Sequence, residues 1–301
     1  MVKPLGLWLA ATRPAFLSVT LVGVLLGLAT ADFDGVFHAP WLAVITLVFA
    51  LVAHAGANVI NDYYDAISGC DAANEERIFP FTGGSRFIQE GVLTPKVTAC
   101  FGYLLLLSVI PAGLYLVRES GTGLIVIGLC GLFAGWAYSA KPLALQSRGI
   151  GELTITIAWM MVVVGSDYVQ RDAFALTPFF TGLAYALLVA NVLFINQIPD
   201  VKADQATGKR TIIVRLGTNM APIGSAVLYL LSSITILIGM TSNTLPAAAS
   251  MTLLTWVPAT LAIHTLYTGK NDKTALSRVI RLTIISALLF GALLSLVLLV
   301  G

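Results

Sequence analysis

The sequence has few charged residues. Only 11% of its 301 residues are Asp, Glu, Lys or Arg, whereas a soluble globular domain carries about 25%. This shortage excludes a water-soluble fold, and a hydrophobic content of 57% excludes intrinsic disorder, which requires low hydrophobicity. The net charge of +2 offers no strongly basic face, so we expect no nucleic-acid partner.

Cysteine and histidine are also scarce. The three cysteines, Cys70, Cys100 and Cys130, are odd in number and scattered, so they predict neither a disulfide framework nor a zinc site. His54 and His264 each lie alone in an apolar run. We interpret both as residues that form hydrogen bonds between helices rather than as ligands.

Long apolar runs are what the sequence has in abundance. A helix that crosses a bilayer needs about 20 largely apolar residues. Nine runs qualify, of which the fifth is the weakest because Glu152 lies near its start: 14–31, 40–60, 97–117, 121–140, 150–167, 174–195, 218–241, 245–267 and 282–301. Such unbroken runs do not fit a β-barrel, whose segments alternate. The sequence predicts an all-α polytopic membrane protein with nine transmembrane helices, forming a single domain over residues 1–301.

The lysines and arginines predict the orientation. If the N-terminus is cytoplasmic, 15 of the 17 lie in inner segments and only Arg118 and Arg171 lie outside. Lys3 and Arg13 precede the first run without a cleavage site for a secretory signal, so we interpret that run as a span. We expect the cytoplasmic membrane of a bacterium or archaeon, with the N-terminus inside and the C-terminus outside.

Two long inner loops begin with similar acidic patterns. Residues 61–65 read Asn-Asp-Tyr-Tyr-Asp, with Asp71 following, and residues 196–200 read Asn-Gln-Ile-Pro-Asp, with Asp204 following. Both patterns contain Asn-x-x-x-Asp after an even-numbered span, so they share one side of the membrane. Helical spacing predicts that Asn61 and Asp65 point the same way, and that Asn196, Asp200 and Asp204 form a second stripe.

The carboxylates of these loops favour a hard cation. Each aspartate alone is typical of a solvated loop, but the repetition beside the bilayer, where polar groups are costly, favours a site. Magnesium prefers oxygen ligands and often joins carboxylates to substrate phosphates. Flanking basic residues, among them Lys141, Lys209 and Arg210, suit a diphosphate.

With these motifs in a nine-span context, the chain resembles the UbiA superfamily of intramembrane prenyltransferases over nearly its whole length. Four further stretches resemble its branch that prenylates 1,4-dihydroxy-2-naphthoate in menaquinone synthesis: Arg13-Pro14, Gly84-Ser85-Arg86 with residues 91–95, Gly149 to Glu152, and Tyr168 to Gln170 with Gly208 to Thr211 and Arg215 to Gly217. The spacing from Asp65 to Asp71 is longer than the commoner Asp-x3-Asp form, and Pro199 stands where relatives often have a basic residue.

The resemblance implies an aromatic polyprenyltransferase whose substrates are a polyprenyl diphosphate and an aromatic acceptor, with Mg²⁺ as cofactor. It places the magnesium on Asn61, Asp65, Asp200 and Asp204, with Asp62 and Asp71 holding a second ion or orienting the first. The candidates for substrate binding are Lys141, Lys209, Arg210, Asn196, Tyr138 and Arg13. Membrane lipid is the expected surrounding, and nothing indicates an obligate protein partner.

Several individual assignments have alternatives. Tyr138, with Tyr63 and Tyr64, could face an allylic cation or belong to an interfacial aromatic belt. Arg13 is a candidate partner of an acceptor carboxylate, and positive-inside anchoring is equally compatible with it. We interpret Glu152 as a residue that locks a loop through a hydrogen bond, with contact to the substrate as the alternative.

Three rival functions are compatible with parts of the sequence. Prenylation of another acceptor, such as 4-hydroxybenzoate, needs the same motifs. Phospholipid-type phosphotransfer also uses membrane aspartates and magnesium, but its Asp-Gly and Gly-x3-Asp-x3-Asp arrangement is not found here. A transporter places its binding groups near the bilayer midplane, whereas these spans are almost free of charge.

Overall fold

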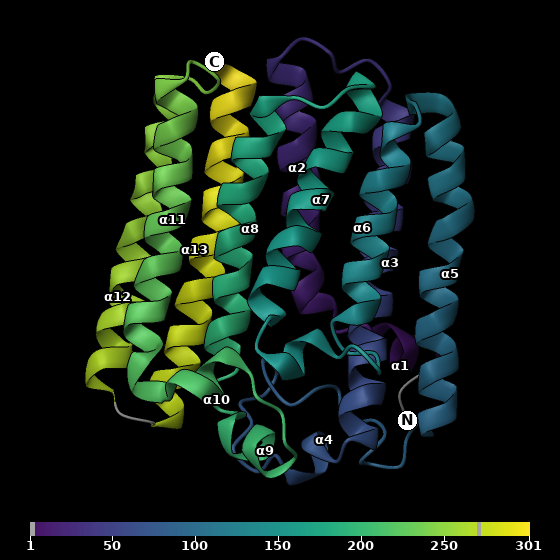
Figure 1. Ribbon diagram of the computed structural model, residues 1–301, viewed down its shortest axis with the longest axis vertical. Helices are drawn as coiled ribbons and strands as arrows, with labels where there is room; N and C mark the ends of the chain where they lie inside the picture. Colours follow the sequence, from purple (N-terminus) through teal and green to yellow (C-terminus); the bar gives the residue numbers. More distant parts are fainter. Residues whose placement is uncertain (1–3, 270–271) are drawn as a thin grey trace.

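The computed structural model describes residues 4–269 and 272–301 of the chain. These residues form helices and connecting loops without a strand, and the long helices stand side by side in an upright bundle (Figure 1). Lys3 and Lys270, which the orientation argument counts as inner residues, lie outside the described residues.

Eight helices of the described chain are long and apolar enough to cross a membrane, and one further apolar helix is shorter. In chain order the nine are α2 (Pro14–Phe33), α3 (Pro40–Ile67), α5 (Pro95–Ser120), the shorter α6 (Gly123–Ala137), α7 (Gly151–Arg171), α8 (Leu176–Asn196), α11 (Ala221–Thr241), the joined η3 (Ala247–Thr255) and α12 (Trp256–Thr268), and α13 (Lys273–Val300). The predicted all-α polytopic fold is confirmed.

The short helices belong to the loops between the spans. They are α1 (Pro4–Ala11), α4 (Cys70–Ala73), η1 (Leu145–Arg148), α9 (Val201–Ala206), α10 (Ile212–Leu216) and η2 (Thr218–Met220). Figure 1 shows α1, α4, α9 and α10 at the end of the bundle where the chain starts, while the C-terminus lies at the opposite end. The helices α4 and α9 contact each other, so the two acidic loops meet.

Two helix boundaries differ most from the predicted spans. Helix α3 continues to Ile67 and ends before Gly69, which adopts a left-handed conformation with φ +80°. Helix α13 begins at Lys273 rather than at residue 282, because Asp272 caps it by accepting a hydrogen bond from the Ala275 amide at 3.1 Å. Hydropathy marks where a helix meets the bilayer surface, whereas caps and glycines mark where the helix itself ends.

The centre of the bundle is packed through glycines of α2. A Cβ atom on Gly27 would lie 2.2 Å from the carbonyl oxygen of Val163 in α7, so only glycine permits this approach. One turn earlier, Gly23 faces the ring of Tyr185 in α8. That tyrosine is fully buried, and its hydroxyl donates to the carbonyl of Val19 at 2.7 Å. Helices α2, α7 and α8 are thereby held tightly together.

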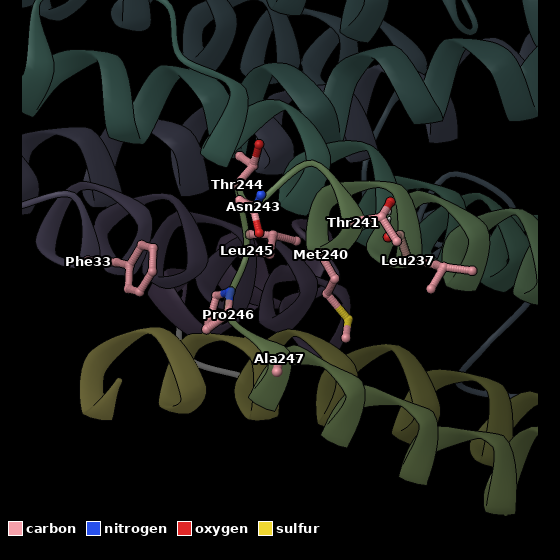
Figure 2. A pocket seen from close by; sticks show the side chains of 9 residues that line it. All are labelled: Phe33, Leu237, Met240, Thr241, Asn243, Thr244, Leu245, Pro246 and Ala247. Atoms are coloured by element: carbon pink, nitrogen blue, oxygen red, sulfur yellow. Dashed lines mark hydrogen bonds between the residues drawn. The ribbon is translucent and has the colours of Figure 1, made fainter.

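A hollow of about 450 Å³ lies at the ends of α2 and α11 that are remote from the acidic loops. Figure 2 shows its lining, which includes Phe33, Met240, Thr241, Asn243 and Leu245. No lining side chain is ionisable. This hollow therefore lacks the charged groups that phosphate or metal chemistry requires.

The glycine packing gives a test of the fold. Gly27→Ala forces a methyl group into backbone of α7, so we expect the free energy of unfolding to fall by about 1–3 kcal/mol. The matched control is Gly128→Ala, because a Cβ atom there has no neighbour within 4 Å. Thermal unfolding in detergent measures both variants, and equal midpoints would contradict the packing described here.

Candidate active site

The first acidic segment begins on the last turns of α3. Because the helix runs through to Ile67, Asn61 and Asp65 lie one turn apart on one face. The Asn61 Nδ2 donates to Asp65 Oδ2 at 3.0 Å and to Ser139 Oγ at 3.0 Å. Both residues line a cavity of about 200 Å³ inside the bundle.

The loop after α3 encloses the other two aspartates of this segment. Asp62 is buried and accepts a hydrogen bond from the Ser85 amide at 3.0 Å, and it is not part of the cavity lining. Asp71 lines the cavity and accepts from Gln89 Nε2 at 3.3 Å. Gly84, with φ +65°, passes so close that a Cβ atom would lie 2.9 Å from Asp62 Oδ1. The loop thus holds Asp62 in place beside the cavity, with its Oδ1 buried and without a hydrogen-bond partner, and leaves Asp71 in the cavity lining.

The second acidic segment is not one helical stripe, as the spacing had suggested. Helix α8 ends at Asn196, residues 197–200 form a turn, and Asp200 precedes the separate short helix α9. Pro199 explains the break, since it has no amide hydrogen and disfavours a helical conformation at the residue before it. Asn196, Asp200 and Asp204 nevertheless all line the same cavity as Asn61 and Asp65.

Direct hydrogen bonds connect the two acidic segments. Asn74, just after α4, donates from Nδ2 to Asp200 Oδ1 at 2.6 Å. The Cys70 Sγ donates to Asp204 Oδ1 at 3.1 Å. Loops that are far apart in the sequence therefore form one side of a single site.

Burial perturbs the acids of these loops. Burial, together with the nearby charges of Asp65 and Asp62, raises the pKa of Asp71 to about 8. Burial is also the main cause that raises the pKa of Asp200 to about 6, and it raises the pKa of Asp204. A site that resists holding several negative charges attracts a positive ligand.

Lys209 supplies a positive charge at this place. Its Nζ lies 2.6 Å from Asp65 Oδ1 and 3.7 Å from Asp204 Oδ1, so it joins the two segments. Burial acts to lower the pKa of Lys209, but the charges of Asp65 and Asp204 outweigh it and raise that pKa well above the ordinary value.

The other predicted substrate contacts separate into two groups. Arg13 and Tyr138 line the cavity, and Arg13 is held by a hydrogen bond from Nη2 to the Phe81 carbonyl at 3.2 Å. In contrast, Lys141 and Arg210 are exposed and do not belong to the lining. Arg210 faces outward because it directly follows the inward-pointing Lys209.

Other residues noted in the sequence hold the surroundings together. Tyr64 pairs with Tyr103 through their hydroxyls at 2.9 Å and does not line the cavity, and neither does Tyr63. Glu152 Oε1 accepts from Gln197 Nε2 at 2.9 Å, which ties the start of α7 to the turn after α8. The sequence motifs did not identify Asn74 as a site residue, although it follows Asp71 by three residues in the acidic loop.

The cavity is polar at its loop end and apolar farther into the bundle. Its inner wall includes Phe16, Val19, Ile155, Ala158, Trp159, Val189 and Val192. His54 lies in this wall, where its Nδ1 is 2.8 Å from Thr20 Oγ1 and its ring meets the edge of Trp159. The space suits an amphiphile whose charged head faces the loops and whose tail lies among the helices.

The oxygen donors of the site fit a hard divalent cation. No three His, Cys, Asp or Glu side chains of the described residues converge closely enough to form a ready metal cluster. However, Asn74 Oδ1 and Asn196 Oδ1 are buried without a hydrogen-bond partner, and both residues line the cavity beside the aspartates. Carboxylate and amide oxygens are ligands that Mg²⁺ accepts.

Comparison with known proteins identifies the family. Residues 16–285 match the UbiA prenyltransferase family. The chain belongs to this family. It is therefore an integral membrane protein and a prenyltransferase.

Curated relatives of this UbiA protein carry names from naphthoate prenylation. The chain is 28% identical to 1,4-dihydroxy-2-naphthoate octaprenyltransferase of Escherichia coli, over 70% of this chain and 68% of that protein. It is 31% identical to 2-carboxy-1,4-naphthoquinone phytyltransferase of Synechocystis, over 74% of this chain and 69% of that protein.

Solved structures share the fold of this UbiA protein. A structure of digeranylgeranylglyceryl phosphate synthase aligns with a TM-score of 0.67 at 14% identity and covers 98% of both chains. A UbiA homolog from Archaeoglobus fulgidus bound to DMAPP and Mg²⁺ aligns with a TM-score of 0.59 at 15% identity, covering 97% of this chain and 99% of that chain.

The position of Asn74 gives a test of the site. Asn74→Ala removes the donor that orients Asp200, so we expect prenyl transfer to slow by about 10- to 100-fold. Asn219→Ala, at an exposed asparagine in η2, is the control and should keep normal turnover. If both variants are equally active, Asn74 has no role in positioning Asp200.

Proposed function

We propose that this UbiA protein transfers a polyprenyl group from a polyprenyl diphosphate to 1,4-dihydroxy-2-naphthoate, as a step of menaquinone synthesis, and that the reaction depends on Mg²⁺. The observation that carries the proposal is the single cavity on which both acidic segments, one buried lysine and an apolar wall converge. The names of the relatives in Escherichia coli and Synechocystis favour a naphthoate as the acceptor.

The geometry assigns roles to the residues at the polar end. Asn61, Asp65, Asp200 and Asp204 would hold the metal, which supplies positive charge to the diphosphate leaving group when bound. Asn196 presents an unpartnered oxygen at the same place. Lys209 lines the same cavity and would donate a hydrogen bond to a phosphate oxygen, and Asp71 adds a further carboxyl group to the lining.

The rest of the cavity serves the reacting carbon and the acceptor. When the bond between carbon and diphosphate oxygen breaks, the apolar wall shields the allylic cation from water. Tyr138 lines the same cavity, so we propose that its ring stabilises that cation. Arg13, fixed by the Phe81 carbonyl, offers a cation for the carboxylate of the acceptor.

We further propose that the whole chain, residues 1–301, acts as one domain with its site on the cytoplasmic side of a bacterial or archaeal cytoplasmic membrane. The acidic loops lie at the same end of the bundle as the start of the chain (Figure 1). The inner segments carry 15 of the 17 lysines and arginines, which is the distribution expected for a cytoplasmic face.

A transfer assay tests the reaction and its acceptor. Purified protein receives labelled polyprenyl diphosphate, Mg²⁺ or EDTA, and either 1,4-dihydroxy-2-naphthoate or 4-hydroxybenzoate. We expect product only from the naphthoate and only with Mg²⁺. Product from the benzoate alone would agree with a prenyltransferase but contradict the naphthoate as its acceptor. Absence of prenyl diphosphate binding would contradict the prenyltransferase reaction itself.

Single carboxylates test the metal assignment. Asp65→Asn and Asp200→Asn each remove a negative charge from the site, so we expect turnover to fall by about 10²-fold or more. Glu90→Gln, at an exposed carboxylate of the same loop region, should remain active. Near-normal turnover of Asp65→Asn or Asp200→Asn in well-folded protein would show that the metal is held elsewhere.

A further inference from the structure

A buried lysine occupies the space between the two acidic segments. The Lys209 Nζ lies 2.6 Å from Asp65 Oδ1 in the first segment and 3.7 Å from Asp204 Oδ1 in the second. Its side chain is only 9% exposed. One ammonium group thus neutralises carboxylates that approach each other from two loops.

The backbone around Lys209 keeps its side chain in this place. Gly208 adopts a left-handed conformation with φ +77°, which favours glycine. The amide of Lys209 then donates to the Asp204 carbonyl at 2.8 Å, and the amide of Arg210 donates to the Ser147 carbonyl at 2.9 Å. Bonds on both sides of the residue therefore direct Lys209 inward and Arg210 outward.

The position of the ammonium conflicts with that of a shared metal ion. A magnesium ion binds its oxygen ligands at about 2.0–2.1 Å. A divalent cation held by both Asp65 and Asp204 would lie a few ångströms from the Lys209 Nζ, where like charges repel strongly in a site of low dielectric constant. The metal and the ammonium therefore cannot both remain between these two carboxylates.

We propose that Lys209 is the resident counter-cation of the metal-free site and yields its place only when the metal arrives together with a diphosphate. This inference rests on the proposed function, because it takes a metal–diphosphate complex as the ligand. The phosphate oxygens give the ammonium new partners in exchange for Asp65 and Asp204. Free metal gives it none, so metal and diphosphate bind cooperatively, and each raises the affinity for the other.

Metal binding without diphosphate tests the proposal. Mn²⁺ binding to the full chain in detergent is followed by electron paramagnetic resonance, with Lys209→Met as the variant that removes the charge and keeps the length. We expect Lys209→Met to bind Mn²⁺ alone about tenfold more tightly than the original protein, within the usual range of coupling between sites. Lys209→Arg should bind it as weakly as the original protein does.

Lys202→Met is the matched control for a lost positive charge. Lys202 lies on α9, between the two aspartates of the second segment, but its side chain is exposed and pairs with Glu76. We expect its Mn²⁺ affinity to stay unchanged. Unchanged or weaker Mn²⁺ binding by monodisperse Lys209→Met would overturn the proposal. An equal gain in Mn²⁺ affinity in Lys202→Met and Lys209→Met would also overturn it.

The thermal unfolding midpoint provides a second test that does not depend on activity. Without metal, Lys209→Met leaves Asp65 and Asp204 without a counter-charge, so its thermal midpoint should fall and Mn²⁺ alone should restore it. The original protein should respond little to Mn²⁺ alone. A Lys209→Met midpoint that equals the original one and ignores Mn²⁺ would contradict the role of Lys209 as counter-cation.

Retention of a labelled prenyl diphosphate by the original protein separates this inference from the proposed function. Retention that requires Mn²⁺, with Mn²⁺ binding that is weak until the diphosphate is added, supports both. No retention at all would overturn the proposed function. If the protein retains the prenyl diphosphate but binds Mn²⁺ equally well with and without it, the counter-cation role of Lys209 is overturned and the proposed function is not. This result is decisive even if Lys209→Met fails to fold.

Discussion

The structure depends on the cost of placing several carboxylates at the edge of an apolar bundle. Asp65, Asp71, Asp200 and Asp204 line one small cavity, and burial disfavours the charged forms of Asp71, Asp200 and Asp204 by raising their pKa values. Positive charge is what makes such a cluster stable. The buried Lys209 provides part of it, and a divalent metal ion, bound beside the diphosphate that it accompanies, would supply the rest.

The helix packing places these carboxylates at one end of a cavity whose other walls are apolar. Glycines on α2 let α7 and α8 approach closely, and the cavity extends from the acidic loops between these helices, α3 and α6. A prenyl diphosphate has the same division into a charged head and an apolar tail. Hydrogen bonds from Asn74 and Cys70 join the segments around the short helices α4 and α9 at the polar end of that space.

The sequence predicted the spans and the acidic segments because hydropathy and helical spacing are local properties. Asn61 and Asp65 lie on one face of α3 as their spacing requires. The second segment departs from its predicted stripe, since Pro199 ends α8 and a turn brings Asp200 and Asp204 to the cavity. The inward direction of Lys209 and the outward direction of Arg210 depend on one bond within their own loop, to the Asp204 carbonyl, and on one bond to the distant Ser147 carbonyl, which no spacing rule contains.

In the proposed function, both acidic segments hold one metal ion together with a diphosphate. Anomalous scattering from crystals grown with Mn²⁺ and a prenyl diphosphate would locate that metal directly. We expect a peak between Asp65 at the end of α3 and Asp200 and Asp204 beside α9, with the diphosphate next to it and the Lys209 ammonium on a phosphate oxygen. A peak bound by only one segment, or a diphosphate bound away from the metal, would contradict it.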